Sequence, residues 1–245
     1  MGWRASAAGK RVICASETSL GEPLCPEAVV IDVNAVARRD LGFMPASVTP
    51  ADAACRLWRK YVAVHRAKLY YFAFDSPHLI PQKRVEFLAN ERYAGGSRDP
   101  PDQWSIEVDH MSLSWADAFN ARQTKARLWK VLAQALVKHI ELYATLGTQY
   151  VVDPPNRERY IFPLLPAPPD SNYGEADLKV ACIAAALDCP VVMFTIDWDA
   201  VVQGVIMGSP NLTVSLGNVY PGADRVHYTK RTAPAGTEPK SEQVC

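Results

Sequence analysis

The sequence lacks the cysteine arrangements that hold metal ions or staple a fold. Six cysteines are scattered over 245 residues, and no two of them form a C-x-x-C pair. Such pairs mark structural zinc sites, and closely spaced even sets mark disulfide frameworks. We therefore expect no zinc and no disulfide framework, and a reducing compartment fits the chain best.

Long apolar segments are also missing. No apolar run approaches the roughly 20 residues that a membrane-spanning helix needs. The N-terminal stretch MGWRASAAGKRVI lacks the apolar core of a signal peptide. We expect a soluble intracellular protein with no membrane partner.

An excess of either charge is absent. Lys plus Arg and Asp plus Glu number 26 each, so no net field draws the chain to nucleic acid or to a membrane surface. Any contact with a polyanion must come from local clusters of charge. With 49% hydrophobic and 21% charged residues, the chain has the composition of a globular domain with a sizeable core.

The sequence marks of three common α/β chemistries are missing too. The first apolar run leads into DVNAVARRD, without the glycine-rich turn that binds a dinucleotide pyrophosphate. Neither a G-x-x-x-x-G-K-[ST] phosphate loop nor a G-x-S-x-G nucleophile elbow occurs, and the five histidines show no metal-ligand spacing. These absences argue against dinucleotide binding, P-loop chemistry and α/β-hydrolase chemistry.

What the sequence does contain is an alternation of strand and helix patterns. Short apolar runs predict buried strands at 27–34, 68–75, 159–165 and 190–195. Apolar residues at helical spacing predict a helix that starts at Pro50 after the N-cap Thr49, and further helices over 122–147 and 175–187. A charged helix or helical arm is expected at 81–93. The alternation predicts an α/β fold with a mainly parallel central sheet flanked by helices on both faces.

Six acidic residues fall where the predicted strands end or the following helices begin. They are Asp32, Asp75, Glu175, Asp177, Asp197 and Asp199. In an open parallel sheet, ligands bind beyond the carboxyl ends of the strands. We therefore expect all six carboxylates to converge on one edge of the sheet.

Taken singly, each of these acids has a structural explanation. An acid in the first turn of a helix interacts favourably with the helix dipole, and an Asp after a strand commonly serves a turn or caps a helix. Taken together they repel one another, and some would protonate unless cations neutralised them. Oxygen ligands without His or Cys suit Mg²⁺ or Mn²⁺, and two such ions about 4 Å apart promote phosphodiester hydrolysis.

Three segments resemble the flap endonuclease family, the structure-specific 5′ nucleases that include the XPG-type repair enzymes. VVIDVNAV is similar to the family's first strand, in which Asp is followed by a small residue and then Ser or Asn. YYFAFDSPHLIPQKR is similar to the family's V-F-D-G-x-x-P-x-x-K segment. GEADLKVACIAAALDCPVVMFTIDWDAVVQG resembles the pattern E-A-E, helix, strand, T-x-D-x-D. The resemblance implies a PIN-like 5′ nuclease domain over 1–210. Over 211–245 the sequence signals are weak, and the polar end TAPAGTEPKSEQVC indicates an extension with a disordered tail.

The resemblance also implies catalytic residues and two divalent ions, Mg²⁺ or Mn²⁺. The acids that match the ligands of the first ion, directly or through water, are Asp32, Asp75, Glu175 and Asp177. Those that match the acids near the second ion are Asp197 and Asp199. The family has a helical arch-like insertion whose Lys and Arg contact the scissile phosphate. Lys83 matches the Lys, and Arg84 and Arg92 are the candidates for the Arg.

The sequence departs from the family in three places. The family's seventh acid, which precedes a helix–hairpin–helix that grips duplex DNA, has no counterpart, since Asp224 lies too close to Asp199. Arg38 stands at the position of the family's base-stacking aromatic residue, and we expect it to contact nucleic acid. The interval 95–122 does not match the family's arch. A protein partner that supplies the duplex anchor is therefore a further expectation.

These observations lead to an expected function with two alternatives. We expect a divalent-metal-dependent nuclease, a 5′ flap endonuclease or 5′–3′ exonuclease acting on DNA flaps, ends or branches in repair or replication. One alternative is a catalytically degenerate family member that serves as a scaffold for nucleic acid or protein. The other is a PIN-type ribonuclease, whose substrate is RNA.

Overall fold

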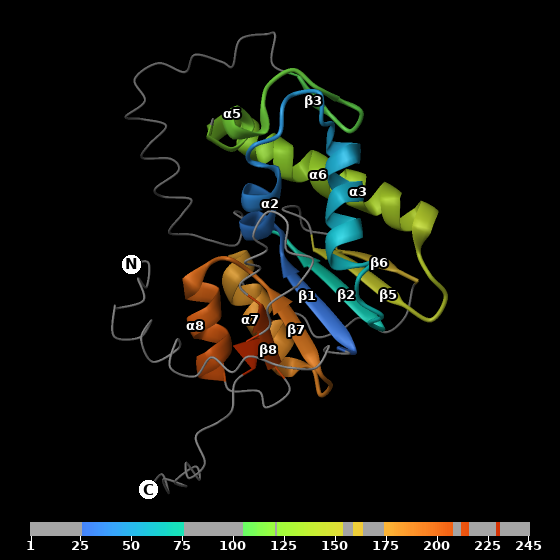
Figure 1. Cartoon of the computed structure of the whole chain (residues 1–245), viewed down its shortest axis with the longest axis vertical. Helices are drawn as coiled ribbons and strands as arrows, with labels where there is room; N and C mark the ends of the chain where they lie inside the picture. The colour runs from blue at the N-terminus through green and yellow to red at the C-terminus, as the bar shows by residue number, and fades with distance from the viewer. Residues whose placement is uncertain are drawn as a thin grey trace, which may run out of the picture.

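A central sheet with helices on both faces organises the computed structural model of this chain (Figure 1). The structure describes residues 26–75, 105–120, 122–153, 159–163, 174–207, 212–215 and 229–230. In these residues, seven strands form the central sheet in the order β6-β5-β2-β1-β7-β8-β9.

The inner strands of this sheet all run in the same direction. They are β1 (Ala28–Asp32), β2 (Leu69–Ala73), β5 (Gln149–Asp153), β7 (Val191–Phe194) and β8 (Leu212–Ser215). Two antiparallel strands close the edges, β6 (Tyr160–Phe162) beside β5 and β9 (Thr229–Lys230) beside β8. The expected mainly parallel sheet is therefore confirmed.

Two hydrophobic cores lie on the two faces of the sheet. The helices on one face are α2 (Val33–Leu41), α3 (Pro50–Tyr61), α5 (Trp115–Asn120) and α6 (Arg122–Tyr143), and those on the other are α7 (Ala176–Ala186) and α8 (Trp198–Met207). Successive residues of a strand point to opposite faces. In β1, Val29 and Ile31 accordingly join the first core, whereas Ala28 and Val30 join the second.

Helix α3 begins where the sequence predicts it. The Thr49 hydroxyl accepts a hydrogen bond from the Asp52 amide at 3.2 Å, and the Asp52 carboxylate accepts one from the Thr49 amide at 3.0 Å. This reciprocal pairing satisfies two amides that the first turn leaves without helical partners. Pro50 occupies the first turn, where a missing N–H costs nothing.

The third parallel strand is not the one that the sequence predicts. It is β5, at Gln149–Asp153, whereas the predicted strand at 159–165 contains β6, which runs antiparallel at the sheet edge. β5 has only three apolar residues, and they follow closely on a long helix, so its pattern is short and easily read as the end of that helix. The helix itself ends at Tyr143, and Gly147 lies beyond it with φ 79°, in the turn that leads to β5.

Several other expectations fall at the margins of the described residues. The predicted arm at 81–93 and the tail after residue 230 lie outside them. The expected boundary at residue 210 falls between α8 and β8, and β8 pairs with β7 in the central sheet. Within 95–122, the described residues form a short hairpin, β3 (Ile106–Glu107) and β4 (His110–Met111), followed by α5.

None of the helices in the described ranges combines the length and the apolar character needed to cross a bilayer.

The capping contact at α3 can be tested by substitution. We expect Thr49→Ala to lower the free energy of unfolding by about 1 kcal/mol, because it removes the acceptor for the Asp52 amide. Thr49→Ser keeps the hydroxyl and should stay close to the wild type. Urea unfolding of the three proteins measures the difference, and equal stability of the Ala and Ser variants would contradict this account of the cap.

Candidate active site at the carboxyl edge of the sheet

The strand order reverses its direction of growth between β1 and β7. Along the chain, the parallel strands add first to one side of β1, as β2 and β5, and then to the other side, as β7 and β8. The connections leaving the carboxyl ends of β1 and β7 therefore diverge to opposite faces, which is where open α/β sheets bind ligands. The acids at the ends of these strands lie at that position.

Asp32 is the buried centre of this edge, with 2% of its surface exposed. Its Oδ1 caps α2 by accepting a hydrogen bond from the Ala35 amide at 3.0 Å, and its Oδ2 accepts one from the Thr195 hydroxyl at 3.0 Å. The pKa of Asp32 is raised to about 7, by burial above all and also by the charges of Asp75 and Asp177, against the lowering effect of the two hydrogen bonds. The end of β1 is thereby joined to Thr195, the residue that follows β7.

Asp75 joins the end of β2 to the start of α7. Its Oδ1 accepts a hydrogen bond from the Ala176 amide at 2.9 Å, across 101 residues of sequence. Its own amide donates to the Asn34 side-chain oxygen at 3.1 Å. Asp75 is thus fixed from α2 and from α7 at once.

Asp177 lies in the first turn of α7, among other acids. Its pKa is raised to about 6, by burial above all and also by the charges of Glu175, Asp197 and Asp75, against the lowering effect of a hydrogen bond from the Leu178 amide at 2.7 Å. These like-charge effects show that the carboxylates of β2, α7 and the segment after β7 share one electrostatic environment.

The last two acids follow β7. The Asp197 amide donates to the Thr195 hydroxyl at 3.0 Å, and the Asp197 side chain accepts from the Asp199 amide at 2.9 Å at the start of α8. Asp197 is exposed, whereas Asp199 is half-buried. Asp199 is therefore connected to the cluster through Asp197.

The predicted acids lie along the carboxyl edge of the sheet, whereas most of the predicted cations lie outside the described residues. At the carboxyl edge the charges of Asp75 and Asp177 act on Asp32, and those of Glu175, Asp197 and Asp75 act on Asp177. Arg38 is exposed in the last turn of α2, six residues beyond Asp32. Lys83, Arg84, Arg92 and Asp224 lie outside the described residues.

The donor set of this edge suits a hard cation in its chemistry. Its ligands are all carboxylate oxygens, the type that Mg²⁺ and Mn²⁺ prefer. Backbone amides hold one oxygen each of Asp75, Asp177 and Asp197. Among the side chains that the structure describes, no three His, Cys, Asp or Glu residues stand close enough together to hold a metal ion. The carboxylates therefore offer the right type of atom, and donors of the protein orient those of Asp32, Asp75, Asp177 and Asp197. The expected pair of ions stays a prediction.

A buried ion pair beneath the acids was not anticipated from the sequence. Lys179 on α7, with 1% of its side chain exposed, lies 3.1 Å from Oδ2 of Asp153 at the end of β5. The Tyr71 hydroxyl donates to the same oxygen at 2.9 Å. The signal that could have found Asp153 is the one that found Asp32 and Asp75, an Asp directly after a short apolar strand.

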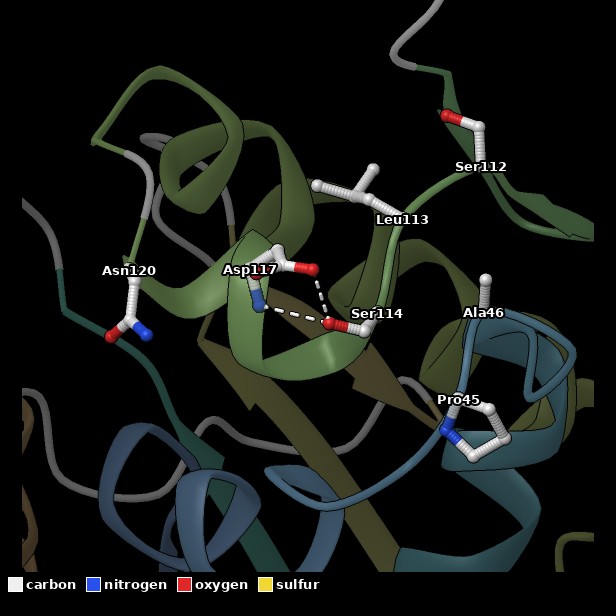
Figure 2. A pocket seen from close by; sticks show the side chains of 7 residues that line it. All are labelled: Pro45, Ala46, Ser112, Leu113, Ser114, Asp117 and Asn120. Atoms are coloured by element: carbon white, nitrogen blue, oxygen red, sulfur yellow. Dashed lines mark hydrogen bonds between the residues drawn. The ribbon is translucent and has the colours of Figure 1, made fainter.

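Two surface cavities lie apart from the acids. One, of about 570 Å³, lies between the loop after α2 and the start of α5 (Figure 2). In it Ser114 faces Asp117, whose amide donates to the Ser114 hydroxyl at 3.2 Å, as expected where a side chain caps a helix. The other, of about 670 Å³, lies between the β3–β4 hairpin and α6. None of the six acids lines either cavity.

Comparisons with known proteins do not assign this edge to a family. No protein-family model matches the chain, and no curated protein sequence matches it.

The raised pKa of Asp32 predicts a pH dependence of stability in EDTA. Because the folded-state pKa is about 7 and the ordinary value is 3.8, the folded protein favours the protonated carboxyl. Asp32 therefore contributes most to the free energy of unfolding below about pH 4. This contribution, on the order of 4 kcal/mol, is lost as the pH rises through about 7. Asp177 acts in the same direction, with a pKa of about 6.

Replacing Asp32 by Asn isolates this contribution. We expect urea unfolding between pH 5 and pH 8 to show a smaller loss of stability for Asp32→Asn than for the wild type. Asp188→Asn is the matched control, because Asp188 is an exposed acid in the turn before β7, at the opposite end of that strand. If the free energy of unfolding changed with pH equally in the wild type and in Asp32→Asn, the pH dependence could not be assigned to Asp32.

Proposed function

We propose that this protein is a divalent-metal-dependent nuclease that hydrolyses phosphodiester bonds and has a PIN-like 5′ nuclease fold. The observation that carries the proposal is the approach of carboxylates from three strand ends beside β1, where burial and then the charges of neighbouring acids raise the pKa values of Asp32 and Asp177. A site that concentrates negative charge in this way is stabilised by cations. Phosphodiester hydrolysis is a reaction that oxygen-liganded divalent ions promote.

Each part of the edge has a role in this proposal. The residues that would hold the first ion are Asp32, Asp75, Glu175 and Asp177, and those near the second are Asp197 and Asp199. Bound divalent ions supply positive charge that offsets charge developing on the phosphate oxygens. Thr195 orients Asp32 through a hydroxyl hydrogen bond, and the Ala176 amide orients Asp75. The chain thus contributes carboxylates whose orientation is fixed before a substrate arrives.

The proposed substrate is DNA with a 5′ flap, end or branch. Support comes from the similarity of three segments to the flap endonuclease family and from the exposed Arg38, six residues after Asp32. In this proposal Lys83 and one of the two candidates Arg84 and Arg92 contact the scissile phosphate. Cationic side chains there stabilise the charge that develops in the transition state. A partner protein supplies the duplex anchor for which the sequence offers no match.

A second candidate is a scaffold that binds nucleic acid or protein without cutting it. The observation that favours it is the departure at the family's seventh acid, for which the sequence offers only Asp224. Metal-dependent turnover separates the two functions, because a scaffold binds its partner in EDTA as well as in Mg²⁺.

The first activity test compares Asp75→Asn with the wild type on a 5′-labelled flap DNA. Asn retains the oxygen that accepts from the Ala176 amide, so the fold should persist while one negative ligand is lost. We expect cleavage in Mg²⁺ or Mn²⁺ to fall at least about 100-fold in the variant, from the loss of charge stabilisation, and to vanish in EDTA. Asp188→Asn removes the same charge at the opposite end of the sheet and should cleave normally. Parental activity in Asp75→Asn would exclude the site.

The second activity test distinguishes the nucleic acids. We expect the wild type to cut near the junction of a flap DNA in preference to a matched single-stranded DNA and to an RNA of the same sequence. Preferential cutting of the RNA would instead support the ribonuclease alternative. Metal-independent binding without cutting of any of the three would support the scaffold.

A further inference from the structure

The peptide group between Phe74 and Asp75 is held by side chains from both faces of the sheet. The Asp75 N–H donates to Oδ1 of Asn34 on α2 at 3.1 Å. The Phe74 C=O accepts from Nζ of Lys179 on α7 at 3.0 Å. Both polar groups of this single peptide unit are therefore bound by side chains, and the two helices that supply them lie on opposite faces.

These contacts act where the sheet no longer holds the chain. The pairing of β1 with β2 ends at Asp32 opposite Ala73, and the pairing of β2 with β5 ends at Ala73 opposite Asp153. One further backbone bond, from the Phe74 amide to the Asp153 carbonyl at 3.0 Å, extends the β5 side. Beyond it, the chain at Asp75 is held by the hydrogen bond that its amide donates to Asn34 and by those that Lys179 and Ala176 donate to Phe74 and Asp75.

Lys179 is costly to bury, which makes its position informative. Its side chain is 1% exposed, on the helix whose N-cap is Glu175 and whose first turn contains Asp177. A buried ammonium needs a compensating charge and hydrogen-bond acceptors. Asp153 supplies the charge at 3.1 Å, and the Tyr71 hydroxyl donates to the same carboxylate. The positive charge is thus balanced by an acid outside the predicted set of six.

We propose that Lys179 is a positioning residue for the acidic site, which it orders through the Phe74–Asp75 peptide rather than by contact with substrate or metal. Lys179 connects α7 to the ends of two strands. Its ammonium donates to the Phe74 carbonyl, just before Asp75 and after β2, and pairs with Asp153 at the end of β5. Asp177 lies on the same helix, α7. Asp153 holds the ammonium in a neutral pair, so the six acids keep their net negative charge. The effect on catalysis rests on the nuclease function proposed above, whereas the effect on the backbone does not.

A double variant separates positioning from simple ion-pair stability. Lys179→Met alone leaves Asp153 buried without its cation and should destabilise the fold. Lys179→Met with Asp153→Asn removes both charges, keeps an oxygen acceptor for the Tyr71 hydroxyl, and should recover most of that stability. The Phe74 carbonyl still lacks its donor in the double variant. Lys68→Met is the matched control, since Lys68 directly precedes β2 at its other end and pairs with Glu27 on the surface.

Two measurements on these proteins test the proposal. Hydrogen exchange of the Asp75 amide, followed by NMR in EDTA, reports the backbone without metal or turnover. Mn²⁺ titration followed by electron paramagnetic resonance reports the site without substrate. In the double variant we expect faster exchange at Asp75 and Mn²⁺ binding about tenfold weaker, although its unfolding midpoint is close to that of the wild type. Lys68→Met should match the wild type in both.

The outcomes are distinct. Wild-type exchange at Asp75 together with wild-type Mn²⁺ affinity in a stable double variant would overturn the proposal and leave Lys179 as an ion-pair partner only. Faster exchange with unchanged Mn²⁺ affinity would also overturn it, because the backbone would then move without affecting the site. A wild-type protein that binds no Mn²⁺ would overturn the proposed function, and the exchange rate would still decide whether Lys179 holds the peptide.

Discussion

Repulsion among carboxylates at the end of the sheet is the constraint on which the rest of this structure depends. Parallel pairing in register brings the ends of β1, β2 and β5 level, and β7 delivers Asp197 beside them. Backbone amides at the starts of α2 and α7 and the hydroxyl of Thr195 hold individual carboxylate oxygens. Helix amino termini carry partial positive charge, so the same helices that cover the sheet also offset the negative edge. The level ends of the parallel strands and the helix starts beside them therefore account both for the fold at this edge and for the proposed site.

The sequence predicts those parts whose signals are local. β1, β2, β7 and α7 each show a compact apolar pattern, and Thr49 with Pro50 marks the start of α3 by residue type alone. The acids at the strand ends follow from these patterns, because a strand that stops at an Asp places that Asp at an edge. Their convergence follows from the preference for parallel strands in an alternating chain.

Other parts required information that is spread across the chain. α2 escaped prediction because Asp32 serves both as the last residue of β1 and as the helix cap, which leaves no separate start signal. β5 has only three apolar residues and follows closely on α6, so its pattern does not stand out. Lys179 is a single charge in an apolar helix, and only the three-dimensional structure shows that Asp153, 26 positions earlier, compensates it. Partners of this kind depend on register, which a single sequence does not encode locally.

The long sequence separations at the carboxyl edge have a consequence for the order of folding. The hydrogen bond from Ala176 to Asp75 spans 101 residues, that from Lys179 to Phe74 spans 105, and that from Thr195 to Asp32 spans 163. Contacts of this kind close large loops, and topologies rich in them fold slowly. During synthesis Asp32 and Asp75 leave the ribosome well before α7 and β7 exist to complete the edge. A partly made chain therefore carries separate acids and no assembled site, and any activity of this edge is confined to chains whose two halves have already come together.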